Sequence, residues 1–257
     1  MQASLIERAE DVRTLLVVHR FFPSSIYGTE TLASYVAEEL RRRGDEVCIV
    51  CAEPSANKVN VEFQLLAGEF NGFEVNRAVY SDGNQHTSAD RTFRNKCFAG
   101  PFSEYLNSRR FDRAIVIHPA DLSGVVFELL NDFSVSTVLV ATDFWTVCPK
   151  GTLLKASGEL CLGPSLLSAN CVGCLLQEAK EPEHVRKRLG KGEAHPPRAP
   201  WMSSTNFTKF LVGVVRRKTY LRQQLGMLKA VAAPTRFMGD ILKRNGVPEQ
   251  LIRIVPY

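Results

Sequence analysis

Near its amino end the chain reads Thr14-Leu15-Leu16-Val17-Val18-His19, followed by a loop over residues 20–27 and then by Gly28-Thr29-Glu30. The apolar run from Leu15 to Val18 is unbroken, a pattern typical of a strand that is buried on both faces of a parallel sheet. A loop that leaves such a strand and opens a helix is the start of a strand–helix–strand unit. The amino end of the sequence therefore predicts an α/β fold.

The segment after Gly28 carries the signals of an amphipathic helix. Its apolar side chains recur at helical spacing on one face: Leu32, Tyr35, Val36 and Leu40. The stretch Arg41-Arg42-Arg43-Gly44 places cations before a glycine, which is typical of a helix end. Residues 46–51 then form the second predicted strand.

Strand and helix patterns continue to alternate along the chain. Further strands are predicted at 61–66, 73–80, 114–118, 135–141, 230–233 and 251–255, with Asn71-Gly72 as a turn. Helices are predicted at 90–108, 122–131, 175–189, 203–225 and 235–245, with a loop at 190–200. This order predicts one domain over residues 1–257, built on a doubly wound, mostly parallel, Rossmann-like sheet. It carries a Cys-rich insertion at about 143–175 and a basic helical segment at about 181–225.

Composition points to a cytoplasmic globular protein. The chain has 257 residues, of which 45% are hydrophobic and 23% charged, as in ordinary soluble domains. Residues 1–13 include Glu7, Glu10 and Asp11 and lack the apolar core of a signal peptide. No apolar run approaches the roughly 18–20 residues of a membrane span. In a reducing compartment, the seven cysteines favour metal binding or burial over disulfides.

Positive charge is concentrated between residues 181 and 222, where ten Lys or Arg stand against three Glu. One interpretation is a basic helix lying on an anionic membrane surface, with Phe207, Phe210, Leu211 and Val215 inserted. Its cations would then be Lys209, Arg216, Arg217, Lys218 and Arg222. The other interpretation is a helix whose apolar stripe faces the core. Nucleic acid is not expected as a partner, because aromatic and basic residues are not interleaved on strands.

Three loops leave the carboxyl ends of predicted strands: residues 22–30, 118–123 and 142–151. In a parallel sheet these loops open on one edge, where ligands bind. Gly28, Thr29 and Glu30 at a helix start offer backbone N–H groups to an anion such as phosphate, or form a tight turn with Thr29 as the helix cap. His118 is an acid, base or hydrogen-bond donor, or a histidine satisfied by backbone.

The loop after the strand at 135–141 begins Thr142-Asp143-Phe144-Trp145. A carboxylate beside an indole ring suits the binding of a sugar or another polyol. In the alternative interpretation, Asp143 caps a turn and Trp145 packs in the core.

Four cysteines follow within twenty-seven residues: Cys148, Cys161, Cys171 and Cys174. Their number fits a tetrahedral thiolate site such as structural zinc, and Cys171-Val172-Gly173-Cys174 has the gap common in zinc knuckles. The longer gaps before it match no zinc-finger spacing. Buried thiols, a redox pair and an iron–sulfur cluster therefore remain alternatives. A metal here would clamp a loop of low apolar content, whereas Cys48 and Cys51 read as core.

Together these segments resemble the amino-terminal domain of a family-4-type glycosyltransferase with the two-domain GT-B fold. The matching stretches are residues 15–23 and 27–30, residues 143–151 with the cysteines at 161, 171 and 174, and residues 232–237 and 246–257. The resemblance covers nearly the whole chain, and its cysteine-bearing loop marks a subgroup.

The resemblance implies transfer of a sugar from a nucleotide-sugar donor to a polysaccharide or lipid-linked acceptor, usually without a catalytic metal and with retention at the anomeric carbon. This half would hold the acceptor at the inner face of the membrane, with Gly28 near the donor phosphates. A carboxyl-terminal domain, expected after Tyr257, would bind the nucleotide sugar, so this half alone would be inactive.

One position departs from the family pattern. Many relatives carry His directly before the Asp-Phe-Trp element, whereas this chain has Thr142. His118 is then the candidate substitute, and Asp143 and His118 are the candidate catalytic residues. The alternative function is a non-catalytic binding or scaffold domain that works with a separate donor-binding partner.

Overall fold

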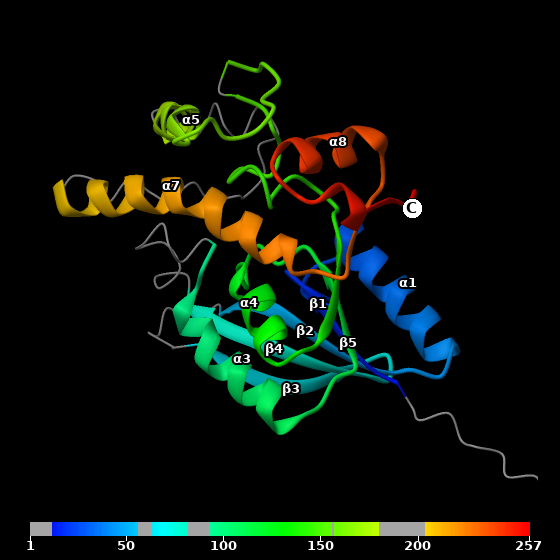
Figure 1. The fold of residues 1–257 in the computed structure, drawn as a ribbon. Coiled ribbons are helices and arrows are strands. Elements are labelled where there is room, and N and C mark those ends of the chain that lie inside the picture. The colour runs from blue at the N-terminus through cyan, green and yellow to red at the C-terminus, as the bar shows by residue number, and fades with distance from the viewer. Residues whose placement is uncertain (1–11, 56–62, 82–92, 156, 180–203) are drawn as a thin grey trace, which may run out of the picture.

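The structure is a computed structural model that describes residues 12–55, 63–81, 93–155, 157–179 and 204–257. It confirms the predicted α/β class and the mostly parallel, doubly wound sheet (Figure 1). The strands are β1 (Arg13–Val18), β2 (Glu46–Ser55), β3 (Gln64–Phe70), β4 (Phe73–Ser81), β5 (Arg113–Ile117), β6 (Ser136–Val140), β7 (Ala230–Ala233) and β8 (Ile252–Ile254). The helices are α1 (Gly28–Arg42), α3 (Lys96–Ser108), α4 (Val125–Asp132), α5 (Ala169–Ala179), α7 (Ser204–Gly226) and α8 (Arg236–Arg244), with a 3₁₀ turn, η2 (Glu249–Leu251).

The sheet has the order β3-β4-β2-β1-β5-β6-β7-β8. Every neighbouring pair is parallel except β3 and β4, which form a hairpin. The chain passes from β1 outward through β2 and later returns to β5 on the other side of β1. The winding direction therefore reverses between β1 and β5, and in open α/β sheets ligands bind beyond the strand ends at such a point.

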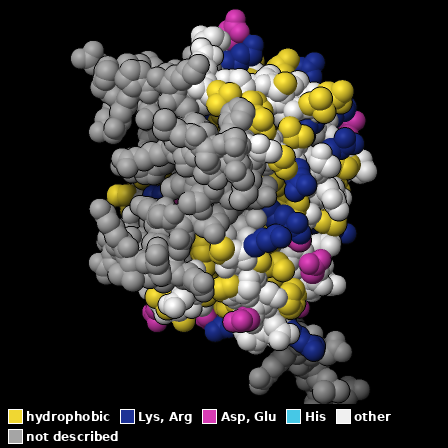
Figure 2. Space-filling view, turned by 90° about the vertical axis from the view of Figure 1, so that its left-hand side faces the viewer, with side chains coloured by type: hydrophobic (Ala, Val, Ile, Leu, Met, Phe, Trp, Pro, Cys, Tyr) yellow, Lys and Arg dark blue, Asp and Glu magenta, His cyan; other side chains and the backbone are white. Residues whose placement is uncertain are grey.

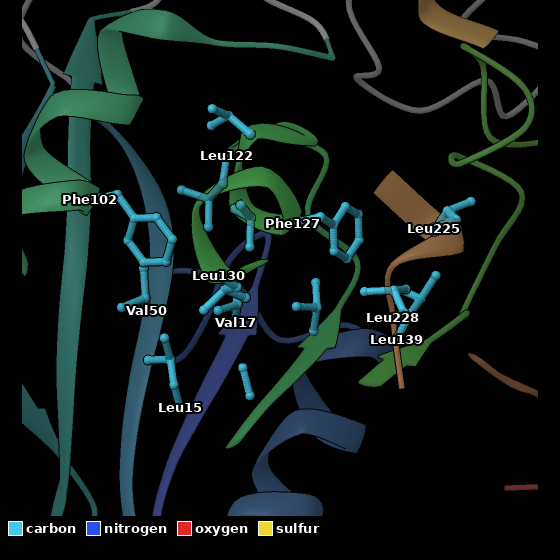
Figure 3. Packing of buried hydrophobic residues seen from close by; sticks show 14 of the residues in the cluster. Leu15, Val17, Val50, Phe102, Leu122, Phe127, Leu130, Leu139, Leu225 and Leu228 are labelled. Carbon is cyan, nitrogen blue, oxygen red and sulfur yellow. The ribbon is translucent and has the colours of Figure 1, made fainter. Parts of the chain in front are cut away.

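The apolar run of β1 supplies both cores. Leu15 and Val17 belong to one hydrophobic cluster, and Leu16 and Val18 belong to the other, as the two-residue period of a strand requires. Helix α1 packs on the second face, whereas α3 and α4 cover the first (Figure 1). Figure 3 shows the first cluster, in which Leu122, Phe127 and Leu130 lie close to the β strands.

Some predicted boundaries were wrong, and local chemistry explains the differences. Helix α3 begins at Lys96, because the Asn95 side chain accepts a hydrogen bond from the Cys97 N–H and caps the helix there, so residues 93–95 were wrongly predicted as helix. Residues 90–92 of that predicted helix and residues 61 and 62 of the predicted strand lie outside the described residues. Helix α4 begins at Val125 rather than at 122, since Ser123 has a positive φ of 77°. Such a backbone angle interrupts a right-handed helix.

Two further boundaries moved. Strand β3 runs on to Phe70, directly before the predicted Asn71-Gly72 turn, whose positive φ angles of 50° and 77° suit a two-residue hairpin. Helix α5 begins at Ala169 and so contains Cys171 and Cys174, whereas the prediction began at 175. The predicted helix beyond residue 179 and the loop at 190–200 lie outside the described residues.

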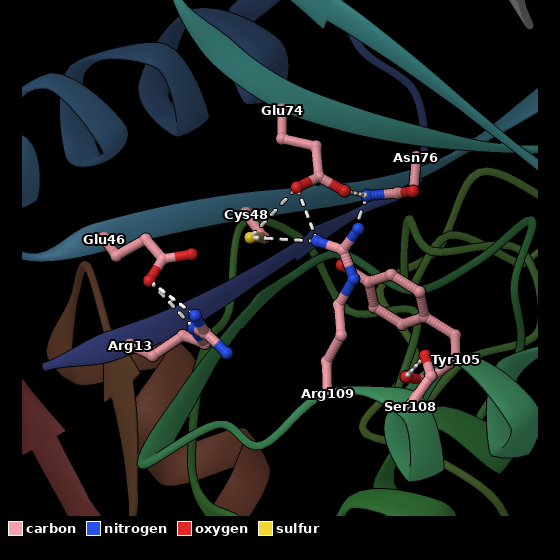
Figure 4. Close-up of polar contacts among 8 residues, drawn as sticks. All are labelled: Arg13, Glu46, Cys48, Glu74, Asn76, Tyr105, Ser108 and Arg109. Carbon is pink, nitrogen blue, oxygen red and sulfur yellow. Dashed lines mark hydrogen bonds and ion pairs between the residues drawn. The ribbon is translucent and has the colours of Figure 1, made fainter.

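A polar cluster stabilises the sheet at the amino-terminal part of β2 and β4 (Figure 4). Arg109 forms an ion pair with Glu74, and the other Glu74 oxygen accepts a hydrogen bond from Asn76. Burial alone would raise the pKa of Glu74, but the hydrogen bonds from Arg109 and Asn76 and the Arg109 charge lower it. This cluster lies near the amino ends of the strands, whereas the candidate site described below lies beyond the carboxyl ends of β1, β5 and β6.

Truncation of Phe102 tests the packing. Phe102 belongs to α3 and is fully buried in the first hydrophobic cluster, and Phe102→Ala should lower the free energy of unfolding by about 3–5 kcal/mol because a cavity remains. The matched control is Phe133→Ala, since Phe133 is 36% exposed at the end of α4. Urea denaturation of both variants measures the difference, and equal losses would contradict the described core.

Candidate functional site

Three strand ends meet at the point where the winding reverses. His19 directly follows β1, His118 directly follows β5, and Asp143 lies three residues after β6. His118 contacts both of the others, through a hydrogen bond to Asp143 and a ring contact with His19. The structure thus brings together the three loops that the sequence predicted would share one edge.

His118 and Asp143 form a hydrogen-bonded pair. The Nε2 atom of His118 lies 2.7 Å from Oδ2 of Asp143. The other carboxylate oxygen, Oδ1, accepts a hydrogen bond of 2.8 Å from the Trp145 N–H. Asp143 therefore caps its own turn, as one of the two interpretations from the sequence expects, and it also contacts His118. Binding of a sugar by Asp143 stays a prediction.

The backbone around this pair is constrained. His118 has a positive φ of 59°, a conformation that is uncommon for residues other than glycine, although five other described non-glycine residues also have a positive φ. Gly151 has a φ of 73°, and a Cβ atom there would lie 2.8 Å from Oδ2 of Asp143. Gly151, which the sequence reasoning did not single out, leaves the space that the Asp143 carboxylate occupies.

A second pair, His19 and Glu30, lies beside the first. The His19 and His118 rings have their centroids 4.6 Å apart in an edge-on arrangement. Glu30 is 0% exposed; its Oε1 accepts a 2.5 Å hydrogen bond from the Ser25 hydroxyl and lies 3.5 Å from Nε2 of His19. The sequence offered one signal for His19 that was not used: like His118, it ends a buried strand.

His19 is neutral at physiological pH. Burial, together with the neighbouring His118 and Arg20, lowers the pKa of His19 to about 4, although Glu30 and Asp143 act in the opposite direction. Its neutral imidazole therefore has one N–H donor and one nitrogen acceptor.

Several buried polar atoms at this edge have no hydrogen-bond partner among the described residues. They are Nδ1 of His19, Nδ1 of His118, Oε2 of Glu30 and the hydroxyl oxygens of Thr142 and Thr146. These atoms are buried, and leaving one such group unsatisfied costs about 1–3 kcal/mol, so each of them needs a partner beyond the described side chains, such as a bound water.

The start of α1 does not have Thr29 as its cap, which was one of the two interpretations from the sequence. Tyr27 is the N-cap residue and Gly28 is the first helical residue, so Thr29 lies inside the first turn and does not cap the helix. A Cβ atom on Gly28 would meet nothing within 4 Å. Gly28 is therefore not required there by packing within the described chain. Phosphate binding at this helix start stays a prediction.

Trp145 lies in the core rather than on an open surface. It is 8% exposed and packs with Phe93 and Leu221. The guanidinium of Arg217, from α7, lies 4.9 Å from the centre of its ring and donates a hydrogen bond to its carbonyl oxygen. The packing interpretation therefore describes Trp145, and little of its ring is available for a sugar.

Known structures share this fold. The chain superposes on sucrose-phosphate synthase from Thermosynechococcus elongatus with a TM-score of 0.51, 11% identity, and coverage of 95% of this chain and 48% of that one. It has the fold of one half of a GT-B glycosyltransferase. A trehalose-6-phosphate synthase from Burkholderia multivorans gives a TM-score of 0.45 at 8% identity, covering 96% of this chain and 48% of that one.

The chain thus spans about half the length of the solved structures that it matches. No family model and no curated protein sequence matches it. The GT-B half-fold is confirmed, whereas the family-4 assignment and the cysteine-loop subgroup stay predictions.

The four cysteines of the insertion lie in one neighbourhood. Burial raises the pKa of Cys171 to about 12, and the nearby thiols of Cys148, Cys161 and Cys174 act in the same direction, against the charge of Arg217. Cys171 packs with Phe210 and Val214 of α7. Among the described residues no group of three or more His, Cys, Asp or Glu side chains is arranged to hold a metal ion. Structural zinc therefore stays a prediction, and the present packing does not supply its geometry.

Thiol reactivity separates these possibilities. As arranged, the exposed Cys97 should be alkylated first, Cys161 and Cys174 more slowly, and the buried Cys51 and Cys171 last, because burial raises the pKa of both of the latter to about 12. Peptide mass spectrometry after timed iodoacetamide treatment measures this order. Zinc binding would instead protect the four insertion cysteines together, with about one zinc per chain by elemental analysis, until a chelator is added.

Proposed function

We propose that this chain is the acceptor-binding half of a glycosyltransferase that transfers a sugar from a nucleotide-sugar donor to a hydroxyl group. The observation that carries the proposal is the His118–Asp143 hydrogen bond at the winding reversal of a GT-B half-fold. A carboxylate that holds one imidazole nitrogen orients the ring and leaves the other nitrogen to act on a hydroxyl proton. The GT-B half-fold makes sugar transfer the expected reaction, and the His118–Asp143 pair offers a base for the acceptor hydroxyl.

The proposed step balances as follows. The acceptor oxygen forms a bond to the anomeric carbon of the donor sugar, and the bond from that carbon to the phosphate oxygen breaks. The hydroxyl proton passes to Nδ1 of His118, while Asp143 stabilises the imidazolium through Nε2–H. The nucleoside diphosphate leaves with the electron pair of the broken bond. The step uses no metal and no cofactor.

The donor is expected to approach the start of α1. The N–H groups of the first helical turn favour phosphate oxygens, and the space over Gly28 is open. The remaining donor contacts would come from the other half of the GT-B architecture, which agrees with the 48% of the sucrose-phosphate synthase chain that this chain covers. The acceptor is proposed to be a polysaccharide or a lipid-linked sugar.

A substitution in the full-length protein tests the catalytic pair. Asp143→Asn should lower turnover of nucleotide sugar by about 10²–10⁴-fold, because His118 loses its orienting carboxylate. The matched control, Asp132→Asn, changes an exposed carboxylate at the end of α4 and should leave turnover unchanged. Circular dichroism confirms folding of both variants. Full activity in Asp143→Asn would remove the pair from the mechanism.

The alternative, a non-catalytic scaffold that works with a separate donor-binding partner, gives a different result. Such a protein would show no turnover with any nucleotide sugar even at full length, and its Asp143→Asn variant would bind the partner normally. Activity that appears only on adding the partner, and that is insensitive to Asp143, would favour the scaffold.

We also propose a peripheral membrane contact, on a surface different from the one first expected. Phe210 is buried against Cys171 and Arg217 is buried against Trp145, as the packing interpretation expects, whereas Val215 is 40% exposed and Arg216 is exposed. The side chains of Phe207 and Lys209 lie outside the described residues. No helix in the described parts of the chain is long and apolar enough to span a bilayer.

The surface that could insert is the tip of the insertion. Leu166 and Leu167 are 90% and 68% exposed, and Lys218 of α7 donates hydrogen bonds to the carbonyls of Pro164 and Ser165 beside them. In Figure 2, hydrophobic side chains border Lys and Arg side chains on the described part of one face. Apolar side chains flanked by cations are typical of binding to anionic membrane surfaces.

Liposome flotation tests this surface. The protein should float with anionic vesicles at low salt, and the Leu166→Ser/Leu167→Ser variant should float less, because it has lost the apolar contact. Binding should also weaken as salt is added, since the cations are screened. Tyr35→Ser, an exposed position on α1, is the control. Equal flotation of the two variants would place the contact elsewhere.

A further inference from the structure

Two exposed aromatic side chains border the loop that carries Asp143, and the proposed catalytic step uses neither of them. Phe237 is 45% exposed in the first turn of α8, and Tyr257, which follows β8, is 57% exposed. Strands β6, β7 and β8 are parallel neighbours, so the segments that follow them lie at one edge of the sheet. Asp143, Phe237 and Tyr257 each stand three or four residues beyond one of these strands.

Specific contacts hold both aromatic side chains against the Asp143 loop. The Tyr257 hydroxyl donates a 2.8 Å hydrogen bond to the carbonyl oxygen of Ala141, two residues before Asp143. Burial raises the pKa of Tyr257, and the negative charge of Asp143 raises it further, so the phenol lies within electrostatic reach of the carboxylate. The Phe237 ring meets the Phe144 ring at 81° with the centroids 5.9 Å apart.

The Asp143 carboxylate is accessible and has acceptor capacity to spare. Its side chain is 38% exposed. An ionised carboxylate has about four acceptor positions. Among the described residues, His118 and the Trp145 N–H use two of them. A ligand hydroxyl group can therefore donate to Asp143 while both of these contacts remain in place.

An accessible carboxylate beside exposed aromatic rings selects among classes of ligand. The carboxylate accepts hydroxyl hydrogens and repels anions, and the negatively polarised face of an aromatic ring attracts C–H groups. A sugar ring presents both kinds of group, with hydroxyls around its rim and C–H groups on its faces. The sequence predicted this combination with Trp145 as the ring, but Trp145 is buried. Phe237 and Tyr257 supply exposed rings near the same carboxylate.

We propose that Phe237 and Tyr257 form an aromatic platform for one face of a sugar ring, and that a hydroxyl group of that ring donates a hydrogen bond to Asp143. The inference rests on the proposed function for the identity of the sugar, which is the acceptor. It deepens that function by naming two side chains that favour a cyclic sugar over an open-chain alcohol with the same hydroxyl groups.

Tyrosine NMR tests the platform on the chain itself. The chain contains six tyrosines, so protein labelled with ¹³C in the tyrosine rings gives few signals, and Tyr257→Phe identifies that of Tyr257. Methyl β-D-glucopyranoside, whose equatorial substituents leave C–H groups on both ring faces, should shift the Tyr257 signal along a saturable curve. The signal of Tyr35, an exposed residue of α1, should stay unchanged. Sorbitol, which has hydroxyl groups but no ring, should shift Tyr257 much less.

Substitutions separate the aromatic face from the phenol hydroxyl. Saturation transfer from protein to the C–H protons of the glucoside measures the dissociation constant in each variant. Tyr257→Leu and Phe237→Leu should each weaken binding by about three- to tenfold, because an aromatic face is lost. Tyr257→Phe keeps the face and should weaken binding less. Asp143→Asn should also weaken it, since a hydrogen bond to a charged acceptor is the stronger one. Tyr35→Leu is the matched control for an exposed tyrosine.

Several outcomes would overturn the platform. They are equal shifts with sorbitol and the glucoside, equal binding by Tyr257→Leu and Tyr35→Leu, and no shift of Tyr257 at the solubility limit of the sugar. A Tyr257 signal that moves with protein concentration instead of sugar would show that a second copy of the chain covers the rings, and would overturn it too.

The full-length protein separates this inference from the proposed function. Tyr257→Leu should raise KM for the acceptor and leave kcat nearly unchanged, because the platform binds the sugar without taking part in proton transfer. A fall in kcat with an unchanged KM would contradict that role. If the glucoside binds as described but Asp143→Asn retains full turnover, the platform stands and the catalytic pair fails. If Asp143→Asn loses turnover but the glucoside does not shift Tyr257, the pair stands and the platform fails.

Discussion

Parallel pairing of β1 with both β2 and β5 is the constraint on which the site depends. In a parallel sheet the carboxyl ends of neighbouring strands lie on one edge, so residues 19 and 118, ninety-nine positions apart, become neighbours. The register pairs Val18 with Ile117, which places the two following histidines side by side. The next parallel strand, β6, delivers Asp143 to the same edge. Without this pairing, the candidate residues would have no common position.

The parts of the fold that could be predicted from sequence are those with a local signal in the chain. The apolar runs of β1 and β5 and the Asn71-Gly72 turn are local signals, and their alternation with helices predicted a doubly wound, mostly parallel sheet, although not its strand order. Helix starts were predicted less well, because they depend on single groups such as the Asn95 cap and the positive φ of Ser123. These groups act through backbone geometry that hydrophobic periodicity does not report.

The candidate site could be predicted only in part, because some of its residues carry a local signal and others matter only through contacts. Asp143 and His118 stood out by residue type and by position after strands, and the structure joins them directly. The residues that make room for Asp143 and that hold Glu30 come from chain positions with no such signal. Gly151 matters because a Cβ atom there would overlap the Asp143 carboxylate, and Ser25 matters because it holds Glu30. Such roles arise from contacts between segments, which one sequence does not display.

Arg217 links the insertion to the site. Burial lowers the pKa of Arg217 to about 10, so the guanidinium stays charged near pH 7 although it is only 4% exposed. Its hydrogen bond reaches the carbonyl of Trp145, two residues from Asp143, and the nearby Cys148 and Cys171 thiols belong to the insertion. A buried cation is costly unless its surroundings hold it in place. The position of Asp143 therefore depends on the packing of α7 against the insertion as well as on the sheet. This dependence gives the cysteine-bearing loop a physical connection to the proposed chemistry, whether or not it binds a metal.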